Sequence, residues 1–143
     1  MENQMEKKPI IRVSDVMKKN FNMVDGVATV KSALQKMEHH DSHVLIVNKR
    51  DEDDEYGIVL LADIAKKVIA KDRSPERVNI YEIMSKPVIC VRDDMDIRYC
   101  SRLFSRFGLN VAPVVKTECG DIIGMVSYND IVLEGLVKLC DEH

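Results

Sequence analysis

The sequence predicts an α/β protein made of two copies of one β-α-β-β-α unit. Short apolar runs of strand length alternate with segments whose apolar residues recur at helical spacing. The same order of elements then starts again, with Gly57 of the first copy matching Gly124 of the second. One copy buries too little apolar surface to be stable alone, so the two are expected to pack together. We assign residues 10–70 to the first repeat, 71–79 to a linker and 80–140 to the second repeat.

The first repeat begins with a short helical turn and continues with strands and helices. Thr29 is a preferred N-cap residue, and the apolar residues after it are three and four apart, which predicts a helix. A second helix is expected to start at Asp63. The predicted order is a turn over 13–17, a strand over 21–24, the helix after Thr29, strands over 43–48 and 56–60, and the helix from Asp63.

The second repeat shows the same sequence of signals. Asp96 is an N-cap candidate for a helix whose apolar residues Ile97, Cys100 and Phe104 are helically spaced. A last helix follows the strand that ends near Val126. The predicted order is a turn over 80–84, a strand over 88–91, the helix after Asp96, strands over 110–115 and 121–126, and the last helix.

Identical residues recur at one constant offset, and the alignment of the repeats needs no gap. This regularity indicates a duplication rather than a chance match. The matching pairs are Met17 with Met84, Lys19 with Lys86, Val24 with Val91, Val44 with Val111, Val47 with Val114, Lys49 with Lys116, Gly57 with Gly124, Asp63 with Asp130, and Ile64 with Ile131.

Composition excludes several classes of protein. The chain has 143 residues, of which 45% are hydrophobic and 31% charged, as is typical of a folded globular domain. A formal net charge of −3 and the few aromatic residues argue against a nucleic-acid surface. No apolar run is long enough to span a bilayer, and no signal peptide is evident. The four cysteines form no C-x-x-C pair, so we expect reduced packing residues and a cytoplasmic protein.

Ser127 and Asp130 stand at a junction where an apolar strand turns into a helix. Free backbone N–H groups at a helix start attract anions and hydroxyl-rich ligands. A helix cap is the alternative interpretation, since Ser and Asp are preferred capping residues whether or not anything binds. In the first repeat Asp63 matches Asp130, but Leu60 replaces the hydroxyl residue. The two junctions are therefore expected to be unequal.

The ordered set of motifs resembles a tandem pair of CBS domains, also called a Bateman module. The resemblance covers about residues 10–140 and rests on the two turns that end at Met17 and Met84, and on the strand over 110–115. It rests equally on the two G-h-h-x-x-x-D-h stretches, 57–64 and 124–131, where h is an apolar residue. It implies a pseudo-two-fold arrangement with ligand sites in the cleft between the repeats. The ligands implied are adenosine-containing: AMP, ADP, ATP or S-adenosylmethionine.

The resemblance also assigns roles to individual residues. It implies that Asp130 binds the ribose hydroxyls and that Ser127 helps to hold the ribose or phosphate; a carboxylate can indeed accept bonds from two adjacent hydroxyls. The same site is expected to gather His43, Phe21 and Asn22 from the first repeat, with adenine on apolar strand residues such as Met125. A weaker site at Asp63 would use Val88, Ile89 and Asn110. No basic phosphate clamp is evident at the family's positions, which puts triphosphate binding in doubt.

Other constellations have simpler interpretations. His39, Asp41 and His43 are close in sequence, but a solvated or helix-end role is favoured over a metal site. Arg98, Arg102 and Arg106 form a basic stripe on one helix, whose alternatives are a solvated face or contact with an acidic partner. The acidic run 51–55 could be such a partner in a second copy, although a solvated hairpin loop is preferred.

The resulting hypothesis is a non-catalytic regulatory module. There is no P-loop, no G-x-S-x-G and no Cys with an evident His partner. The module is expected to bind an adenine nucleotide, require no cofactor, form a homodimer through its outer helices and act on an unidentified partner protein. Those helices are either the pair after Thr29 and Asp96 or the pair after Asp63 and Asp130. The rival hypothesis is a ligand-free structural or interaction module, and a small metal-dependent enzyme is a weaker one.

Overall fold

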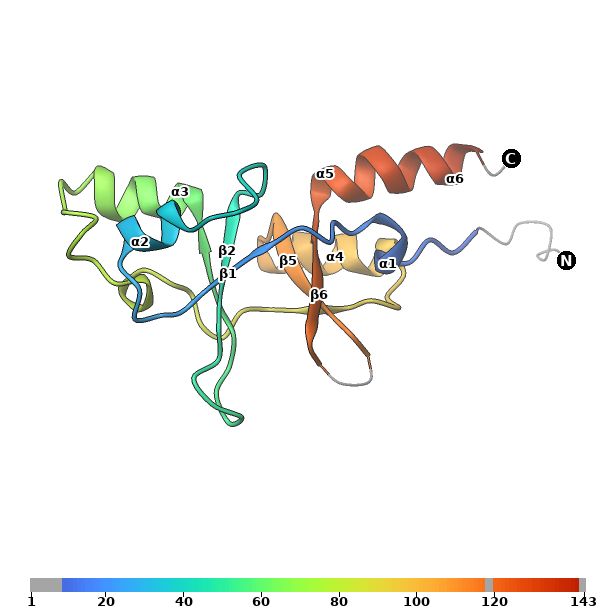
Figure 1. Ribbon diagram of the computed structural model, residues 1–143. Helices are drawn as coiled ribbons and strands as arrows, with labels where there is room; N and C mark the ends of the chain where they lie inside the picture. Colours follow the sequence, from blue (N-terminus) through green and yellow to red (C-terminus); the bar gives the residue numbers. More distant parts are fainter. Residues whose placement is uncertain (1–8, 118–119, 142–143) are drawn as a thin grey trace, which may run out of the picture. The chain divides into compact units, whose positions relative to one another are not determined.

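Strands and helices follow the predicted order and build two units (Figure 1). The computed structural model describes residues 9–117 and 120–141. Unit 1 combines the chain up to Lys19 with the chain from Ile89 onward, and unit 2 comprises Asn20–Val88. Each unit contains a three-stranded sheet with the same topology, which confirms the predicted α/β class and its duplication.

Unit 2 holds the first of the two sheets. Its first strand is parallel to the second, which is antiparallel to the third. The third strand runs directly into a helix (Figure 1). The elements are β1 (Asn22–Val24), α2 (Val30–Gln35), β2 (Val44–Val47), β3 (Gly57–Leu60), α3 (Leu61–Ile64), the π-helical continuation η2 (Ala65–Ile69), and the 3-10 turn η3 (Ile80–Glu82).

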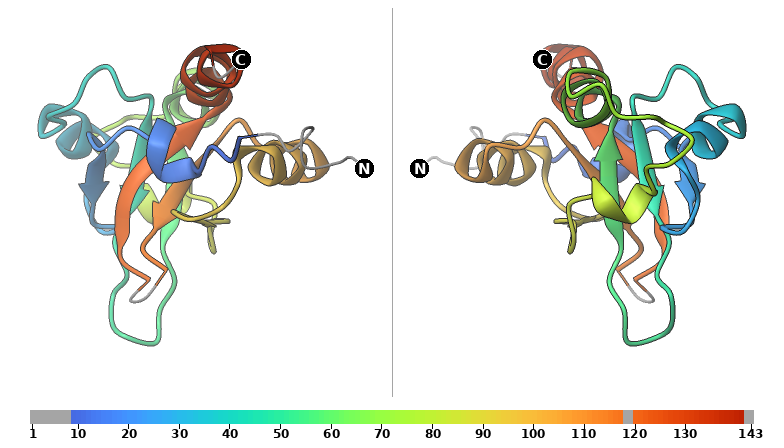
Figure 2. Two further views of the ribbon diagram at one scale, coloured as in Figure 1. Left: turned by 90° about the vertical axis from the view of Figure 1, so that its right-hand side faces the viewer. Right: turned by 90° about the vertical axis from the view of Figure 1, so that its left-hand side faces the viewer.

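Unit 1 repeats this arrangement with longer helices. The strand order is again parallel and then antiparallel. The long helix after its third strand runs through three consecutive elements (Figure 1) and is seen nearly end-on, in red, in Figure 2. The elements are α1 (Val13–Val16), β4 (Val91–Arg92), α4 (Ile97–Phe107), β5 (Val111–Val115), β6 (Ile122–Ser127), α5 (Tyr128–Asp130), the π-helical segment η4 (Ile131–Leu136) and α6 (Val137–Asp141).

Each unit takes its short helical turn from the other sequence repeat. The segment after α1 pairs with β6: Lys18 N–H donates to the Met125 carbonyl at 2.8 Å, and Met125 N–H donates back at 2.9 Å. In unit 2, Ser85 after η3 exchanges the equivalent pair of bonds with Ile58 of β3, at 2.9 and 3.0 Å. Units and sequence repeats therefore have different boundaries, because 9–19 and 80–88 cross between them.

A glycine on each third strand permits this close pairing. A Cβ atom added to Gly124 would lie 2.7 Å from the Lys18 carbonyl oxygen and 2.9 Å from Met17 Sδ. At Gly57 the added atom would lie 3.0 Å from Met84 Sδ and 3.3 Å from the Ser85 carbonyl oxygen. Gly124 is thus required by a backbone contact, whereas at Gly57 the tightest contact is with a side chain.

Each unit has its own apolar core, because buried aliphatic residues on the strands face buried residues on the helices. Cys100 belongs to the core of unit 1, and burial raises the pKa of its thiol to about 11, as suits a packing residue. Cys119 lies outside the described residues. The core of unit 2 consists of Val30, Ala33, Leu45, Val47, Val59, Ile64, Val68, Val78, Ile80 and Ile83.

The structure confirms the predicted caps, but one helix and one strand start at other residues than predicted. Thr29 Oγ1 accepts from Ser32 N–H at 3.1 Å and Asp96 Oδ1 from Arg98 N–H at 2.8 Å, which confirms both caps. The helix predicted to start at Asp63 begins at Leu61, because strand β3 turns directly into it. The strand predicted over 88–91 is shorter and lies later in the chain, as β4 (Val91–Arg92), because Val88 N–H donates to the Tyr56 carbonyl within unit 2.

No helix in the described parts of the chain is long and apolar enough to cross a membrane.

Gly124, Gly57 and Gly26 should differ in their tolerance of an added methyl group. We expect Gly124→Ala to lower the free energy of unfolding by about 1–3 kcal/mol, because the carbonyl of Lys18 must move. Gly57→Ala should cost less, since the end of the Met84 side chain can move aside. Gly26→Ala is the control, because its added Cβ meets only ordinary contacts of 3.5 Å or more. Urea unfolding of the three variants tests this ranking, and equal midpoints would refute it.

Candidate functional site

Ser127 and Asp130 form a reciprocal cap where β6 becomes α5. Ser127 N–H and Oγ both donate to Asp130 Oδ2 at 3.0 Å, and Ser127 Oγ accepts from Asp130 N–H at 3.2 Å. Asp130 is 9% exposed, and few charged side chains are so buried. The capping interpretation is therefore correct for these residues. It also leaves Asp130 Oδ1 outside the cap.

A lysine that the sequence analysis did not consider lies beside this carboxylate. Lys18 Nζ is 3.8 Å from Asp130 Oδ1, which is too long for a hydrogen bond. The ammonium instead donates to Glu134 on η4, and this bond raises the pKa of Lys18. Lys18 reaches the junction only because its segment pairs with β6, so no local sequence signal pointed to it. One cation and two carboxylates leave this group with one excess negative charge.

Asn110 and Met125 also border the junction in unit 1. The carbonyl of Asn110, just before β5, accepts from Tyr128 N–H at 3.1 Å, and the Asn110 side chain is exposed. Met125 is buried, 5% exposed, and its backbone pairs with Lys18. Asn110 therefore lies at the junction of Ser127 and Asp130 through its backbone carbonyl, while its side chain is exposed.

The matching junction of unit 2 has the same backbone geometry and fewer polar groups. Leu60 N–H donates to Asp63 Oδ2 at 2.9 Å, and the His43 carbonyl accepts from Leu61 N–H at 3.0 Å. Both bonds are the counterparts of bonds in unit 1. Leu60 has no hydroxyl to donate, so the Asp63 carboxylate lacks the second bond that Ser127 makes. His43 is exposed at the start of β2.

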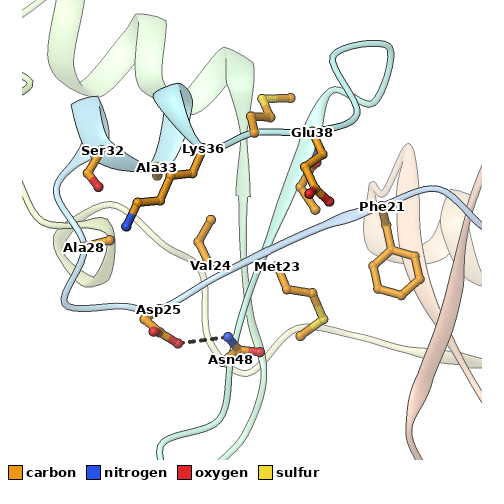
Figure 3. A pocket seen from close by; sticks show the side chains of 12 residues that line it. Phe21, Met23, Val24, Asp25, Ala28, Ser32, Ala33, Lys36, Glu38 and Asn48 are labelled. Carbon is orange, nitrogen blue, oxygen red and sulfur yellow. Dashed lines mark hydrogen bonds between the residues drawn. The ribbon is translucent and has the colours of Figure 1, made fainter.

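Phe21 and Asn22 lie together at the start of β1, where they line a pocket of about 210 Å³ between β1 and α2 (Figure 3). The amide of Asn22 is already paired, because Nδ2 donates to the His39 carbonyl at 3.0 Å and Oδ1 accepts from His39 N–H at 2.9 Å. Asn22 is 5% exposed, so it stabilises the loop that contains His39. Phe21 is partly exposed.

The remaining predicted residues mark the border of the two units. Val88 is the last residue of unit 2 and is held by Tyr56, whereas Ile89 is the first of the second part of unit 1 and is 39% exposed.

The other constellations have structural roles in the described residues. Within residues 9–117 and 120–141, no three His, Cys, Asp or Glu side chains are grouped as metal ligands. Arg98 donates to Asp96 at 3.2 Å and to the Pro9 carbonyl at 3.1 Å, so it leaves the predicted basic stripe. Arg102 and Arg106 are exposed and lie over the rings of Tyr99 and Phe107, respectively.

Known proteins share both the repeats and the fold. An uncharacterized protein of Methanopyrus kandleri is 35% identical over 103 residues, which are 72% of this chain and 51% of that protein. The hexameric CBS-CP12 protein of bloom-forming cyanobacteria matches with a TM-score of 0.82 and 33% identity, over 90% of this chain and 74% of that one. The CBS domain pair of protein MJ0100, solved with 5′-methylthioadenosine and S-adenosylmethionine, matches with a TM-score of 0.73 and 25% identity, over 91% and 99%.

The chain spans about half the length of that curated relative and about a quarter of two others. The family model of the CBS domain matches residues 13–70 and again residues 80–136. These two matches coincide with the duplicated stretches, and with the repeated glycine and capping geometry they show that the chain belongs to the CBS domain family, with two CBS domains in tandem.

Proposed function

We propose that this chain is a regulatory module that binds an adenosine-containing ligand at the junction of β6 and α5. The observation that carries the proposal is the buried Asp130 carboxylate. Its Oδ2 is fixed by Ser127, while Oδ1 lies 3.8 Å from Lys18 and accepts no bond from it. A carboxylate oriented in this way can accept from a ribose hydroxyl without first breaking its cap.

The charges around Asp130 favour a ligand with few phosphates. Lys18 lies beside the junction, and it is shared between two carboxylates, Asp130 and Glu134. An added triphosphate would meet a group that already carries excess negative charge. A neutral nucleoside, or S-adenosylmethionine with its positively charged sulfonium, would not be repelled by this group. The related pair of MJ0100, solved with 5′-methylthioadenosine and S-adenosylmethionine, supports an adenosine ligand without phosphates.

The Asp63 junction is the weaker of the two sites. It keeps the carboxylate and the backbone geometry but has Leu60 in place of a hydroxyl residue. Contacts of the ligand with His43, Phe21 and Asn22, and of a second ligand with Val88, Ile89 and Asn110, stay predictions. Asn22 would first have to release its bonds to His39.

A second copy of the chain is the proposed partner of the last helix. The last helix exposes four apolar residues, Val132, Leu133, Leu136 and Val137, with exposed fractions of 49 to 68%. The matching positions of the first repeat are mostly small or charged, with only Ile69 comparably apolar. The hexameric CBS-CP12 relative supports self-assembly. We therefore favour the helices after Asp63 and Asp130 as the homodimer surface over those after Thr29 and Asp96.

Signalling follows if the ligand prefers one arrangement of the dimer. Binding then shifts that arrangement, and a partner protein can sense the shift. No chemical step is required of any residue in this mechanism, so the proposed module is not an enzyme. The rival is a ligand-free interaction module, in which Ser127 and Asp130 are a cap and nothing more.

Calorimetric titration tests the ligand site. We expect S-adenosylmethionine or 5′-methylthioadenosine to bind more tightly than ATP, and Asp130→Ala to weaken binding by about 1–3 kcal/mol, the scale of an unpaired polar group. Asp63→Ala is the matched control and should change the affinity much less. If no adenosine compound gives a heat of binding, and thermal unfolding shows that the protein is folded, the ligand-free module would be favoured.

Changing the charges beside Asp130 tests the preference for ligands with few phosphates, and two substitutions should shift it in opposite directions. Glu134→Gln removes one of the two carboxylates around Lys18 and should improve the binding of AMP and ATP relative to 5′-methylthioadenosine. Lys18→Met should shift the ratio the other way. The same titrations measure both ratios, and unchanged ratios would remove the electrostatic argument.

The missing hydroxyl can be supplied by mutation. Leu60→Ser places a donor beside Asp63 Oδ2 at the position that Ser127 holds beside Asp130. We expect this variant to bind a second equivalent of ligand more tightly than the wild type does. Leu60→Ala is the control for lost apolar packing, and an equal stoichiometry and affinity in both variants would contradict the role given to the hydroxyl.

The dimer surface is tested by charge insertion. Leu133→Glu, at a residue 68% exposed, should convert the dimer to monomer in sedimentation experiments, because a carboxylate cannot be buried unpaired in an apolar interface. Tyr99→Glu on α4 is the matched control on the competing surface, since Tyr99 is also exposed, at 60%. Dissociation by Tyr99→Glu alone would assign the interface to α4.

A further inference from the structure

A second pocket lies within unit 2, at the end of β2 opposite to His43. It measures about 660 Å³, which is within the range of small-molecule sites. Asp25 and Asn48, which directly follow the parallel strands β1 and β2, are joined there by a hydrogen bond of 2.9 Å. Crevices outside the carboxyl ends of parallel strands are common ligand sites. The lining residues are Asp25, Gly26, Val27, Val47, Asn48, Lys49, Arg50, Tyr81, Met84 and Lys86.

Three cations line this pocket from two parts of the chain. Lys49 and Arg50 follow β2, and Lys86 follows the turn η3. Lys86 is only 23% exposed, so its ammonium is partly desolvated. Lys49 Nζ lies 5.1 Å from the centre of the Tyr56 ring. These cations occur together because η3 packs into unit 2, and sequence analysis had no reason to group Lys86 with Lys49.

One carboxylate, that of Asp54, bridges two of the cations. Asp54, with a side chain 8% exposed, lies 2.6 Å from Lys86 Nζ and 3.2 Å from Arg50 Nε. The hydrogen bond from Lys86 holds the pKa of Asp54 well below its usual range. Counting Asp25 and Asp54 against Lys49, Arg50 and Lys86, the pocket keeps one excess positive charge.

Apolar groups complete the lining and are unusually exposed. Val27 is 75% and Tyr81 55% exposed. Both lie beside the partly buried Met84 and the buried Val47. A pocket lined by both an exposed aromatic ring and a partly desolvated cation suits a ligand with a planar apolar body and one charged end.

We propose that this pocket binds a small organic monoanion, with its planar body on Tyr81 and Val27 and its anionic group at Lys86 and Arg50. The exposed carboxylates of the same hairpin loop, Asp51, Glu52, Asp53 and Glu55, disfavour a multiply charged ligand. The site is separate from the Ser127–Asp130 junction, which belongs to unit 1. It does not depend on the proposed nucleotide function.

The probe for this site is 8-anilinonaphthalene-1-sulfonate, an aromatic monoanion whose fluorescence rises on binding. We expect Lys86→Met to weaken its binding about tenfold, the scale of one hydrogen bond to a charged group. Lys86→Arg, which keeps the charge, should bind nearly as well as the wild type. Added salt should weaken binding to the wild type more than to Lys86→Met.

A variant with the opposite sign separates binding from folding. Asp54→Asn frees Lys86 and Arg50 from their shared carboxylate, so it should tighten binding of the probe while lowering the thermal stability of the hairpin. Asp130→Ala should leave binding of the probe unchanged, and Lys86→Met should leave adenosine-ligand titrations unchanged. Equal affinities of Lys86→Met, Asp54→Asn and wild type would overturn the proposal, as would loss of probe binding in Asp130→Ala.

Discussion

The pairing of one short backbone segment with the third strand of each sheet is the contact on which the other features depend. Lys18 and Met125 exchange two backbone hydrogen bonds, and Ser85 and Ile58 exchange two more. Such pairing leaves little room for a side chain at the crossing point, least at Gly124 and somewhat more at Gly57. Because each segment belongs to the other repeat, neither repeat can complete its unit alone.

This exchange also determines the chemistry of both candidate sites. Lys18 lies near Asp130 and Glu134 only because residues 9–19 pack in unit 1. Lys86 reaches Asp54 only because residues 80–88 pack in unit 2. Lys18 and Lys86 each bring a cation to carboxylates that are distant in sequence. Around Lys18 the two carboxylates outnumber the cation, and around Lys86 the Asp54 carboxylate neutralises part of the positive charge. Both arrangements disfavour a ligand that carries several negative charges.

In the proposed site, Ser127 and Asp130 serve both as a helix cap and as ligand-binding groups. Oδ2 of the carboxylate serves the cap, and this fixes the orientation in which Oδ1 is presented. Leu60 shows the reverse case, since the cap-like bond from its N–H to Asp63 forms without any hydroxyl. The backbone geometry of the junction is therefore a property of the fold, whereas the second polar contact is a property of the side chain.

Local signals in the sequence were sufficient for much of the fold. The caps at Thr29 and Asp96 and the repeated apolar runs depend on neighbouring residues, and the duplication was evident from identical residues at a constant offset. The same comparison identified Leu60 as the point where the two junctions differ. The pairing of Asn22 with His39 was missed, because a side-chain amide that binds a distant backbone leaves no periodic signal.

By itself the sequence determined the fold class, the two-fold repetition and the pair of carboxylates at the junctions, because all three are expressed in local spacing. Only the tertiary structure decided which cations accompany those carboxylates, that Arg98 is used for the Pro9 segment, and that a pocket opens beyond β1 and β2. These features depend on segments that exchange between the repeats. The position of such a segment follows from the fit of its backbone against a glycine on a strand far along the chain.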